Sequence, residues 1–160
     1  MKTKLPLALA LTLLVAASLA GCTATATTPT TAPSAPAPKA PAATTVDAKT
    51  ASISLGTVIV DGSGHTAYFF DKDTKGTTTS ACSGGCAATW PAITSASATP
   101  KVTGITGTVA TIPSAGGKFQ ITVNGMPIYD FSGDSAAGDS NGQGVAGIWW
   151  AAGPDGTEVK

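Results

Sequence analysis

The sequence predicts an all-β domain, a small sandwich or barrel made of two related hairpin-containing repeats. Helical signals are poor after residue 50, because Gly, Thr, Ser and Val dominate the composition there. Short alternating runs recur between turns rich in Gly, Asn and Asp, which is typical of strands. The pattern Y-x-F-x-x-D also occurs twice, starting at Tyr68 and again 61 residues later at Tyr129. These three observations favour a duplicated β unit.

Two hairpins are expected, one in each repeat. In the first, residues 57–60 lead through a Gly-rich turn into an alternating run at residues 65–70. In the second, residues 119–123 lead through Asn124-Gly125 into residues 126–131. Asn-Gly between alternating runs is the strongest short hairpin signal, because a type I′ turn needs positive φ at both central positions.

Further strands are expected at residues 108–112 and 147–151. Each repeat then consists of a hairpin whose second strand carries Y-x-F, an Asp-led loop and a tryptophan segment. The repeats span about residues 55–95 and 117–153 of a β domain assigned to residues 50–160. Each unit is too small to be stable alone, so we expect the two to pack face to face.

The two motif copies supply the candidate site residues. Because alternate residues of a strand point to one face, the Tyr and Phe of each copy lie side by side. In one interpretation these are core-facing aromatic residues, and the aspartates cap the following loops by accepting backbone N–H bonds. In the other, the same residues line a ligand cleft. These ligand-binding or framework candidates are Tyr68, Phe70, Asp73, Trp90, Tyr129, Phe131, Asp134 and Trp149.

Residues 1–21 have the features of a lipoprotein signal peptide. Lys2 and Lys4 precede an apolar run over residues 5–20, which is short and wrongly flanked for a stable transmembrane span. The run ends in Leu-Ala-Gly-Cys, which resembles the lipobox of bacterial lipoproteins. The resemblance implies cleavage before Cys22 and lipidation of its thiol, and two or three acyl chains anchor a protein almost permanently. We therefore expect an extracytoplasmic protein that is lipid-anchored to a bacterial membrane.

Residues 22–49 are predicted to comprise the lipidated cysteine and a disordered tether. After the cysteine, most of the segment is Thr, Ala and Pro. Such a composition cannot bury enough apolar surface to offset the entropy of ordering. The segment is assigned no binding role.

The charge balance restricts the partners. Residues 50–160 contain five lysines and eight acidic residues, and the whole chain contains no arginine. This composition argues against nucleic acid, whose binding depends on neutralising phosphates, and against an electrostatic lipid-binding face. The expected partners are the membrane, through the lipid anchor, and an envelope ligand or protein.

Cys82 and Cys86 are the two cysteines of the predicted domain. In an oxidising compartment the default for such a pair is a disulfide. A copper or redox site is the alternative, since C-x-x-x-C can hold a soft metal. That site needs a further soft or imidazole ligand, for which the chain offers only His65 and Met126.

Other metal or catalytic chemistry has weak sequence support. Asp134, Asp139 and Asn141 form an oxygen-rich loop that could hold calcium, although a solvated turn is the simpler interpretation. His65 is the sole histidine and begins a strand, where an exposed imidazole is expected. The sequence lacks a nucleophile elbow, so we assign no catalytic residue, metal or cofactor.

Four features together resemble the predicted bacterial lipoproteins with a conserved Yx(F/W/Y)xxD motif, also described as a secreted repeat of unknown function. They are the lipobox, the doubled motif, CSGGCAATWP at residues 82–91 and GDSNGQG at residues 138–144. The resemblance covers about residues 55–152 and implies an envelope lipoprotein, without lending an established activity. The sequence thus favours a non-catalytic binding or structural module of the cell envelope. An envelope redox or copper-handling protein is the alternative.

Overall fold

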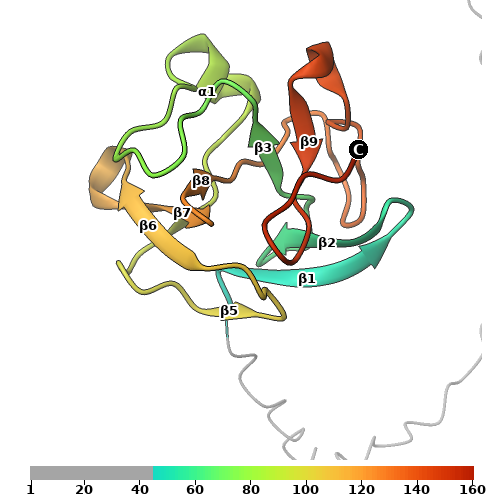
Figure 1. Ribbon diagram of the computed structural model, residues 1–160, viewed down its shortest axis with the longest axis horizontal. Helices are drawn as coiled ribbons and strands as arrows, with labels where there is room; N and C mark the ends of the chain where they lie inside the picture. Colours follow the sequence, from blue (N-terminus) through green and yellow to red (C-terminus); the bar gives the residue numbers. More distant parts are fainter. Residues whose placement is uncertain (1–44) are drawn as a thin grey trace, which may run out of the picture. The chain divides into compact units, whose positions relative to one another are not determined.

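The computed structural model describes residues 45–160 (Figure 1). The predicted signal peptide, Cys22 and residues 23–44 lie outside the described residues. The first strand, β1 (Ala48–Ile53), includes the last two residues that the sequence assigned to the tether. Ala48 is fully buried, so the strand is part of the domain from its first residue.

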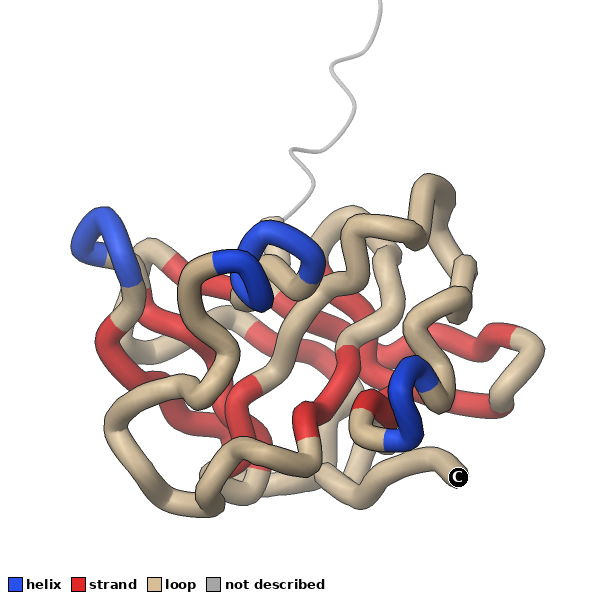
Figure 2. Tube along the Cα trace, turned by 90° about the horizontal axis from the view of Figure 1, so that it is seen from above, coloured by secondary structure: helices blue, strands red, loops and turns tan. Residues whose placement is uncertain are grey.

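The described domain is all-β, as predicted. Its strands are short and joined by loops, with three short helical segments (Figure 2). These are the α-helix α1 (Gly85–Thr89) and the 3-10 segments η1 (Ala115–Gly117) and η2 (Val145–Gly147). None of the helices within residues 45–160 has the length and apolar character required to span a bilayer.

The strands form three sheets and, within the described residues, no closed barrel. In the first sheet, β1 lies between the antiparallel β2 (Gly56–Asp61) and the parallel β5 (Val102–Thr103). In the second, β3 (Tyr68–Phe70) pairs with the antiparallel β9 (Trp149–Ala151).

The third sheet has the order β4-β7-β6, and β8 also pairs with β7. Its strands are β4 (Thr94–Ser95), β6 (Val109–Pro113), β7 (Phe119–Val123) and β8 (Met126–Pro127). All three pairings of β7 are antiparallel. The predicted strand at residues 108–112 is therefore β6, displaced by one residue.

The second predicted hairpin is present between β7 and β8. Its turn residues Asn124 and Gly125 have φ values of 51° and 81°, both positive, as a type I′ turn requires. The first hairpin is only partly formed. At its turn the Asp61 carboxylate accepts the backbone N–H groups of residues 63–65. Beyond the turn, β2 and the next strand share one bridge pair before that strand leaves to pair with β9.

The two repeats have equivalent strands in the same order along the chain. β1, β2 and β3 of the first repeat correspond to β6, β7 and the segment from β8 to Phe131 of the second. Tyr68 and Tyr129 meet where the repeats join and exchange both backbone bonds. The Tyr68 N–H donates to the Tyr129 carbonyl at 2.8 Å, and the Tyr129 N–H donates to the Tyr68 carbonyl at 3.0 Å. This is the reciprocal pair of two antiparallel strands.

Each tryptophan segment pairs with the other repeat and not with its own. The second segment is β9, which pairs with β3 of the first repeat. The first segment bridges Tyr129 through Ala92, and the Ile93 N–H donates to the Ile128 carbonyl at 3.1 Å. The repeats thus interlock by exchanging a strand, which corrects the face-to-face packing that we expected. The physical reason is that edge strands need partners for their backbone groups, and the other repeat supplies them.

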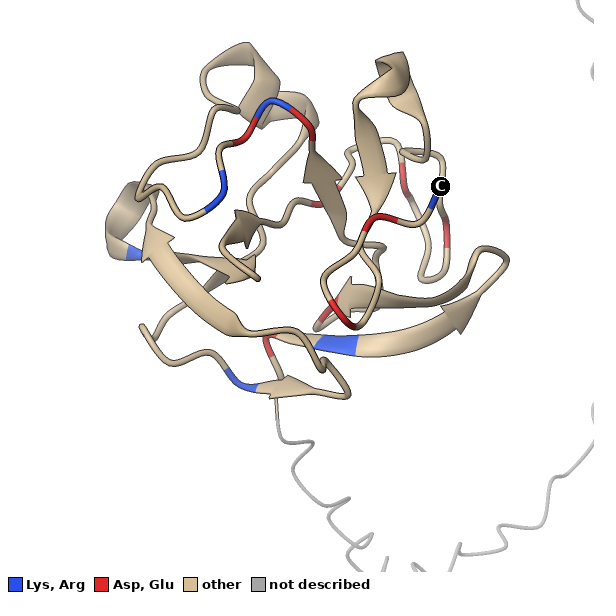
Figure 3. Cartoon of the chain, viewed as in Figure 1, with Lys and Arg blue, Asp and Glu red and all other residues tan. Residues whose placement is uncertain are grey.

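Two clusters of buried side chains form the core of the domain. Successive side chains along a strand point alternately into one cluster and the other. In β2, Ile59 points into a first cluster around Phe69 and Ile121, whereas Val58 and Val60 point into a second cluster of aromatic rings. Charged residues lie mostly in the loops (Figure 3). Within residues 45–160, only two of them, Lys49 and Asp61, belong to strands.

Candidate functional site

The two Y-x-F-x-x-D copies meet at the centre of the domain and bond to each other. The Tyr68 hydroxyl donates to Asp134 Oδ2 at 2.7 Å, and the Tyr129 hydroxyl donates to Asp73 Oδ2 at 2.6 Å. Each tyrosine therefore binds the aspartate of the other motif copy. All four side chains are buried, with exposed fractions of 8% or less.

The second oxygen of each aspartate holds the loop that follows it. Asp73 Oδ1 accepts the Ala81 N–H at 2.7 Å, and Asp134 Oδ1 accepts the Asn141 N–H at 2.8 Å. The backbone N–H of each aspartate also closes a turn, onto the carbonyl of the motif phenylalanine three residues earlier. The carboxylates thus fix the start and the end of each loop, which is the capping geometry that the sequence suggested.

Each tyrosine hydroxyl has one further polar partner from the loop of the other repeat. The Ser80 hydroxyl lies 2.6 Å from the Tyr129 hydroxyl, and the Gly142 N–H donates to the Tyr68 hydroxyl at 3.2 Å. Burial and the bonded aspartate raise the pKa of both tyrosines above its usual value, so both hydroxyls stay protonated and donate. The two centres are closed networks of satisfied hydrogen bonds.

The four other motif-associated rings form a continuous stack between the two tyrosines. Phe70 stacks on Trp149 with centroids 4.1 Å apart, Trp149 on Trp90 at 3.7 Å, and Trp90 packs on Phe131 at 4.4 Å. The edges of the tyrosines close the stack, since Tyr68 meets Trp90 at 5.5 Å and Tyr129 meets Trp149 at 5.4 Å. Offset and edge contacts of this kind add to the free energy gained by burial.

The structure therefore brings all eight candidate residues of the two motifs into one cluster. That cluster is packed, and Phe131 is the member with the most exposed side chain. Three hollows of 220–290 Å³ open elsewhere on the described domain and are lined by other residues. The geometry is that of a framework that joins the repeats.

The residues considered for metal binding are not gathered into a metal centre. Within residues 45–160, no three His, Cys, Asp or Glu side chains lie together so that they could hold an ion. His65 Nδ1 lies 3.6 Å from Asp61 Oδ2. In the oxygen-rich loop, Asp139 accepts the N–H groups of residues 135 and 136, which lower the pKa of its carboxyl. Asn141 bonds back to Asp134.

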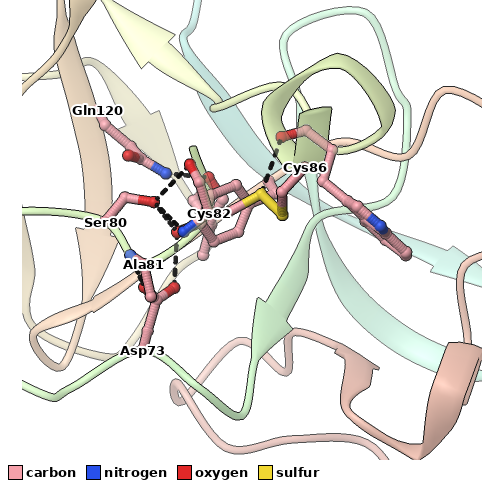
Figure 4. Close-up of a disulfide and its surroundings, with 9 residues drawn as sticks. Asp73, Ser80, Ala81, Cys82, Cys86 and Gln120 are labelled. Carbon is pink, nitrogen blue, oxygen red and sulfur yellow. Dashed lines mark hydrogen bonds between the residues drawn. A yellow bond between two sulfur atoms is a disulfide. The ribbon is translucent and has the colours of Figure 1, made fainter. Parts of the chain in front are cut away.

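Cys82 and Cys86 form a disulfide, as predicted (Figure 4). The bridge closes the first turn of α1 against the loop that carries Ser80. The Cys82 N–H donates to the Ser80 hydroxyl at 3.0 Å, so the bridge is joined to the Tyr129–Asp73 network. Cys82 is buried among the aromatic rings, whereas Cys86 is half-buried.

Two polar residues of interest were not identified from the sequence. Ser80 completes the Tyr129 network from a stretch of small polar residues, in which nothing distinguishes it. Asp130 lies between the Tyr and the Phe of the second motif copy, at the position that Phe69 occupies in the first. Comparing the two copies position by position would have found it.

The fold and the central cluster define a small module made of two interlocked β repeats. Comparison with protein families agrees with this description. A family described as a secreted repeat of unknown function matches residues 49–94 and again residues 110–153, more than half of the chain, and the chain belongs to this family. The two matches start at β1 and β6, so each includes the first strand of its repeat. No curated protein and no solved structure matches the chain.

We expect the exchanged hydrogen bonds to be measurable as energetic coupling. Tyr68→Phe should lower the free energy of unfolding in urea by about 1–3 kcal/mol, since it leaves a buried carboxylate oxygen of Asp134 without its donor. Combining it with Asp134→Asn should give a coupling free energy of about 1 kcal/mol or more. The matched pair Tyr68→Phe with Asp73→Asn, within one motif copy, should couple less. Stronger coupling within the copy would contradict the exchange.

Proposed function

We propose that the protein is a lipoprotein of the bacterial cell envelope, anchored through Cys22. Its β domain is a non-catalytic binding or structural module, held off the membrane by the Thr/Ala/Pro-rich segment. Two independent features support the proposal. Residues 19–22 resemble a lipobox, and the repeats belong to a family described as a secreted repeat. Lipidation and secretion together require an extracytoplasmic membrane surface as the place of action.

The proposal that the module is non-catalytic rests on the hydrogen bonds of the motif side chains. The tyrosine hydroxyls and aspartate carboxylates are the most chemically active groups of the repeated pattern. Each is buried and bonded to the other repeat. A catalytic acid, base or nucleophile must reach a substrate atom, and these groups are already engaged. The pattern is explained by its contribution to the framework, which leaves the outer loops to contact an envelope ligand or protein.

The anchor is tested by replacing Cys22. Cells expressing the native chain and fed an alkyne-bearing fatty acid should incorporate the label into this protein, and the protein should sediment with membranes. The Cys22→Ala protein should carry no label, and no processed, membrane-bound form of it should appear. The acyl chains that provide the anchoring free energy are then missing.

A matched control uses the other two cysteines. A double Cys82→Ser and Cys86→Ser chain should keep the label and stay with membranes. Loss of label from this control, or sedimentation of Cys22→Ala unchanged, would contradict anchoring through Cys22. Stoichiometric copper bound to the reduced native chain would instead support a metal-handling protein that uses the C-x-x-x-C pair.

A further inference from the structure

The two repeats differ in charge at two neighbouring pairs of equivalent positions. Phe69 and Asp130 each lie between the Tyr and the Phe of their motif copy. Ile59 and Ile121 also correspond, because their N–H groups donate to the Ala152 and Ile93 carbonyls at 2.7 and 2.9 Å, one in each exchanged segment. Two residues further along each strand, β2 has Asp61 and β7 has Val123.

The apolar pair Phe69 and Val123 is therefore replaced by two carboxylates, Asp130 and Asp61, at the equivalent place on the other side of the junction between the repeats. Phe69 and Val123 belong to the first buried cluster, with exposed fractions of 1% and 0%. At the equivalent place, Asp130 and Asp61 line a cavity of about 270 Å³. Asp47 lines the same cavity, together with backbone and apolar groups. A polar hollow thus lies beside Asp130, whereas the equivalent place beside Val123 is filled by the ring of Phe69.

Asp130 is under-bonded in this cavity. Its Oδ1 is buried, and it is the one buried side-chain N or O atom without a hydrogen-bond partner among residues 45–160. Its backbone, in contrast, is firmly held, since the Asp130 N–H donates to the Pro91 carbonyl at 2.9 Å. A negative charge on Asp130 would lie on the strand that joins the two repeats.

We propose that Asp130 is a proton-binding group whose ionisation weakens the pairing between the Tyr129 strand and the first tryptophan segment. The interlock of the two repeats is then tightest in acid and loosens as the external pH rises toward neutrality. An extracytoplasmic domain is directly exposed to that pH.

The groups that face Asp130 favour its neutral form. Burial, followed by the negative charge of Asp61, raises the pKa of the Asp130 carboxyl to about 7, and Asp134 adds to the rise. His65, next to Asp61, acts in the opposite direction. Asp47 is the remaining acid of the cavity wall. At the cavity edge, Lys49 Nζ donates to the Gly62 carbonyl at 3.3 Å.

The sign of the effect follows from proton linkage. An exposed Asp has a pKa of about 4, so between about pH 4 and 7 the open strand releases a proton that the closed strand retains. The equilibrium for opening should then rise up to about tenfold for each pH unit in that range. Above about pH 7 both states are ionised, and the opening equilibrium should level off.

The test is amide hydrogen exchange of the full chain from pH 5 to 8, corrected for intrinsic exchange. The Asp130 and Ile93 amides, which bond across the proposed opening, should lose protection as the pH rises to 7. The amide of Ala152, which is equivalent to Ile93, bonds to the Ala67 carbonyl, and the amide of Asp71, at the end of the same β3–β9 ladder, bonds to the Ile148 carbonyl; both should change little. This comparison needs no variant, and equal loss at both places would overturn the proposal.

Variants identify the titrating group. Asp130→Asn should keep the Asp130 amide position protected from pH 5 to 8, because the side chain can no longer ionise. His65→Gln should keep the pH dependence. If Asp130→Asn retains the pH dependence, or His65→Gln abolishes it, Asp130 is not the responsible group and the proposal fails.

Discussion

Trp149→Ala is expected to lower the free energy of unfolding by about 3–5 kcal/mol, enough to unfold much of the protein. Trp149 is 3% exposed, and its ring lies between Phe70 and Trp90, with centroids at 4.1 and 3.7 Å. The edge of the ring also meets Tyr129. Truncation removes the middle of the stack that joins the two repeats, so it leaves a cavity against both.

The adjacent residue provides the matched control. Trp150 is less buried than Trp149, and it donates from Nε1 to Asp71 at 3.1 Å, with Lys160 Nζ 5.0 Å from its ring centroid. Trp150→Ala should therefore lower the free energy of unfolding by about 1 kcal/mol or less. Urea unfolding measures both values, and near-ultraviolet circular dichroism should lose the signal of the stacked tryptophans only in Trp149→Ala. Similar losses in the two variants would show that the stack does not hold the repeats together.

Local physics made the second hairpin predictable. Asn124 and Gly125 tolerate the positive φ that a type I′ turn demands, and the flanking residues alternate. The first hairpin carried a longer turn, and there the structure departs further from the prediction. Its turn is formed around Asp61, but β3 leaves β2 after one bridge pair, because β9 offers it a three-residue ladder.

The sequence could not predict which tyrosine bonds to which aspartate, or which strand each tryptophan segment pairs with. The pattern shows that Tyr68 is equivalent to Tyr129 and Asp73 to Asp134, but a tyrosine bonded to its own aspartate and one bonded to the other copy are equally compatible with it. The same is true of the tryptophan segments. Strand signals come from neighbours along the chain, whereas the pairing is decided by distant contacts, such as those between Ile93 and Ile128 and between Tyr68 and Asp134, which lie 66 residues apart.

A second large effect is expected from cutting the domain between Ala98 and Thr99, in an exposed stretch after β4. Neither piece, residues 45–98 or 99–160, should fold alone. Each would keep its motif strand but lose the exchanged tryptophan segment that pairs with it, and each would leave a tyrosine and an aspartate without their partners. Mixed together, the pieces should fold, because nearly every central contact joins one piece to the other.

Circular dichroism and tryptophan fluorescence of the separate and mixed pieces measure this directly. The 99–160 piece with Trp149→Ala should fail to complement its partner at concentrations where the piece with Trp150→Ala succeeds, since only Trp149 belongs to the shared stack. Cooperative unfolding of either piece alone would mean that a repeat is a complete folding unit. In that case the doubled Y-x-F-x-x-D pattern would need an explanation within each repeat, and the buried tyrosine–aspartate pairs would be a consequence of association and not a condition for folding.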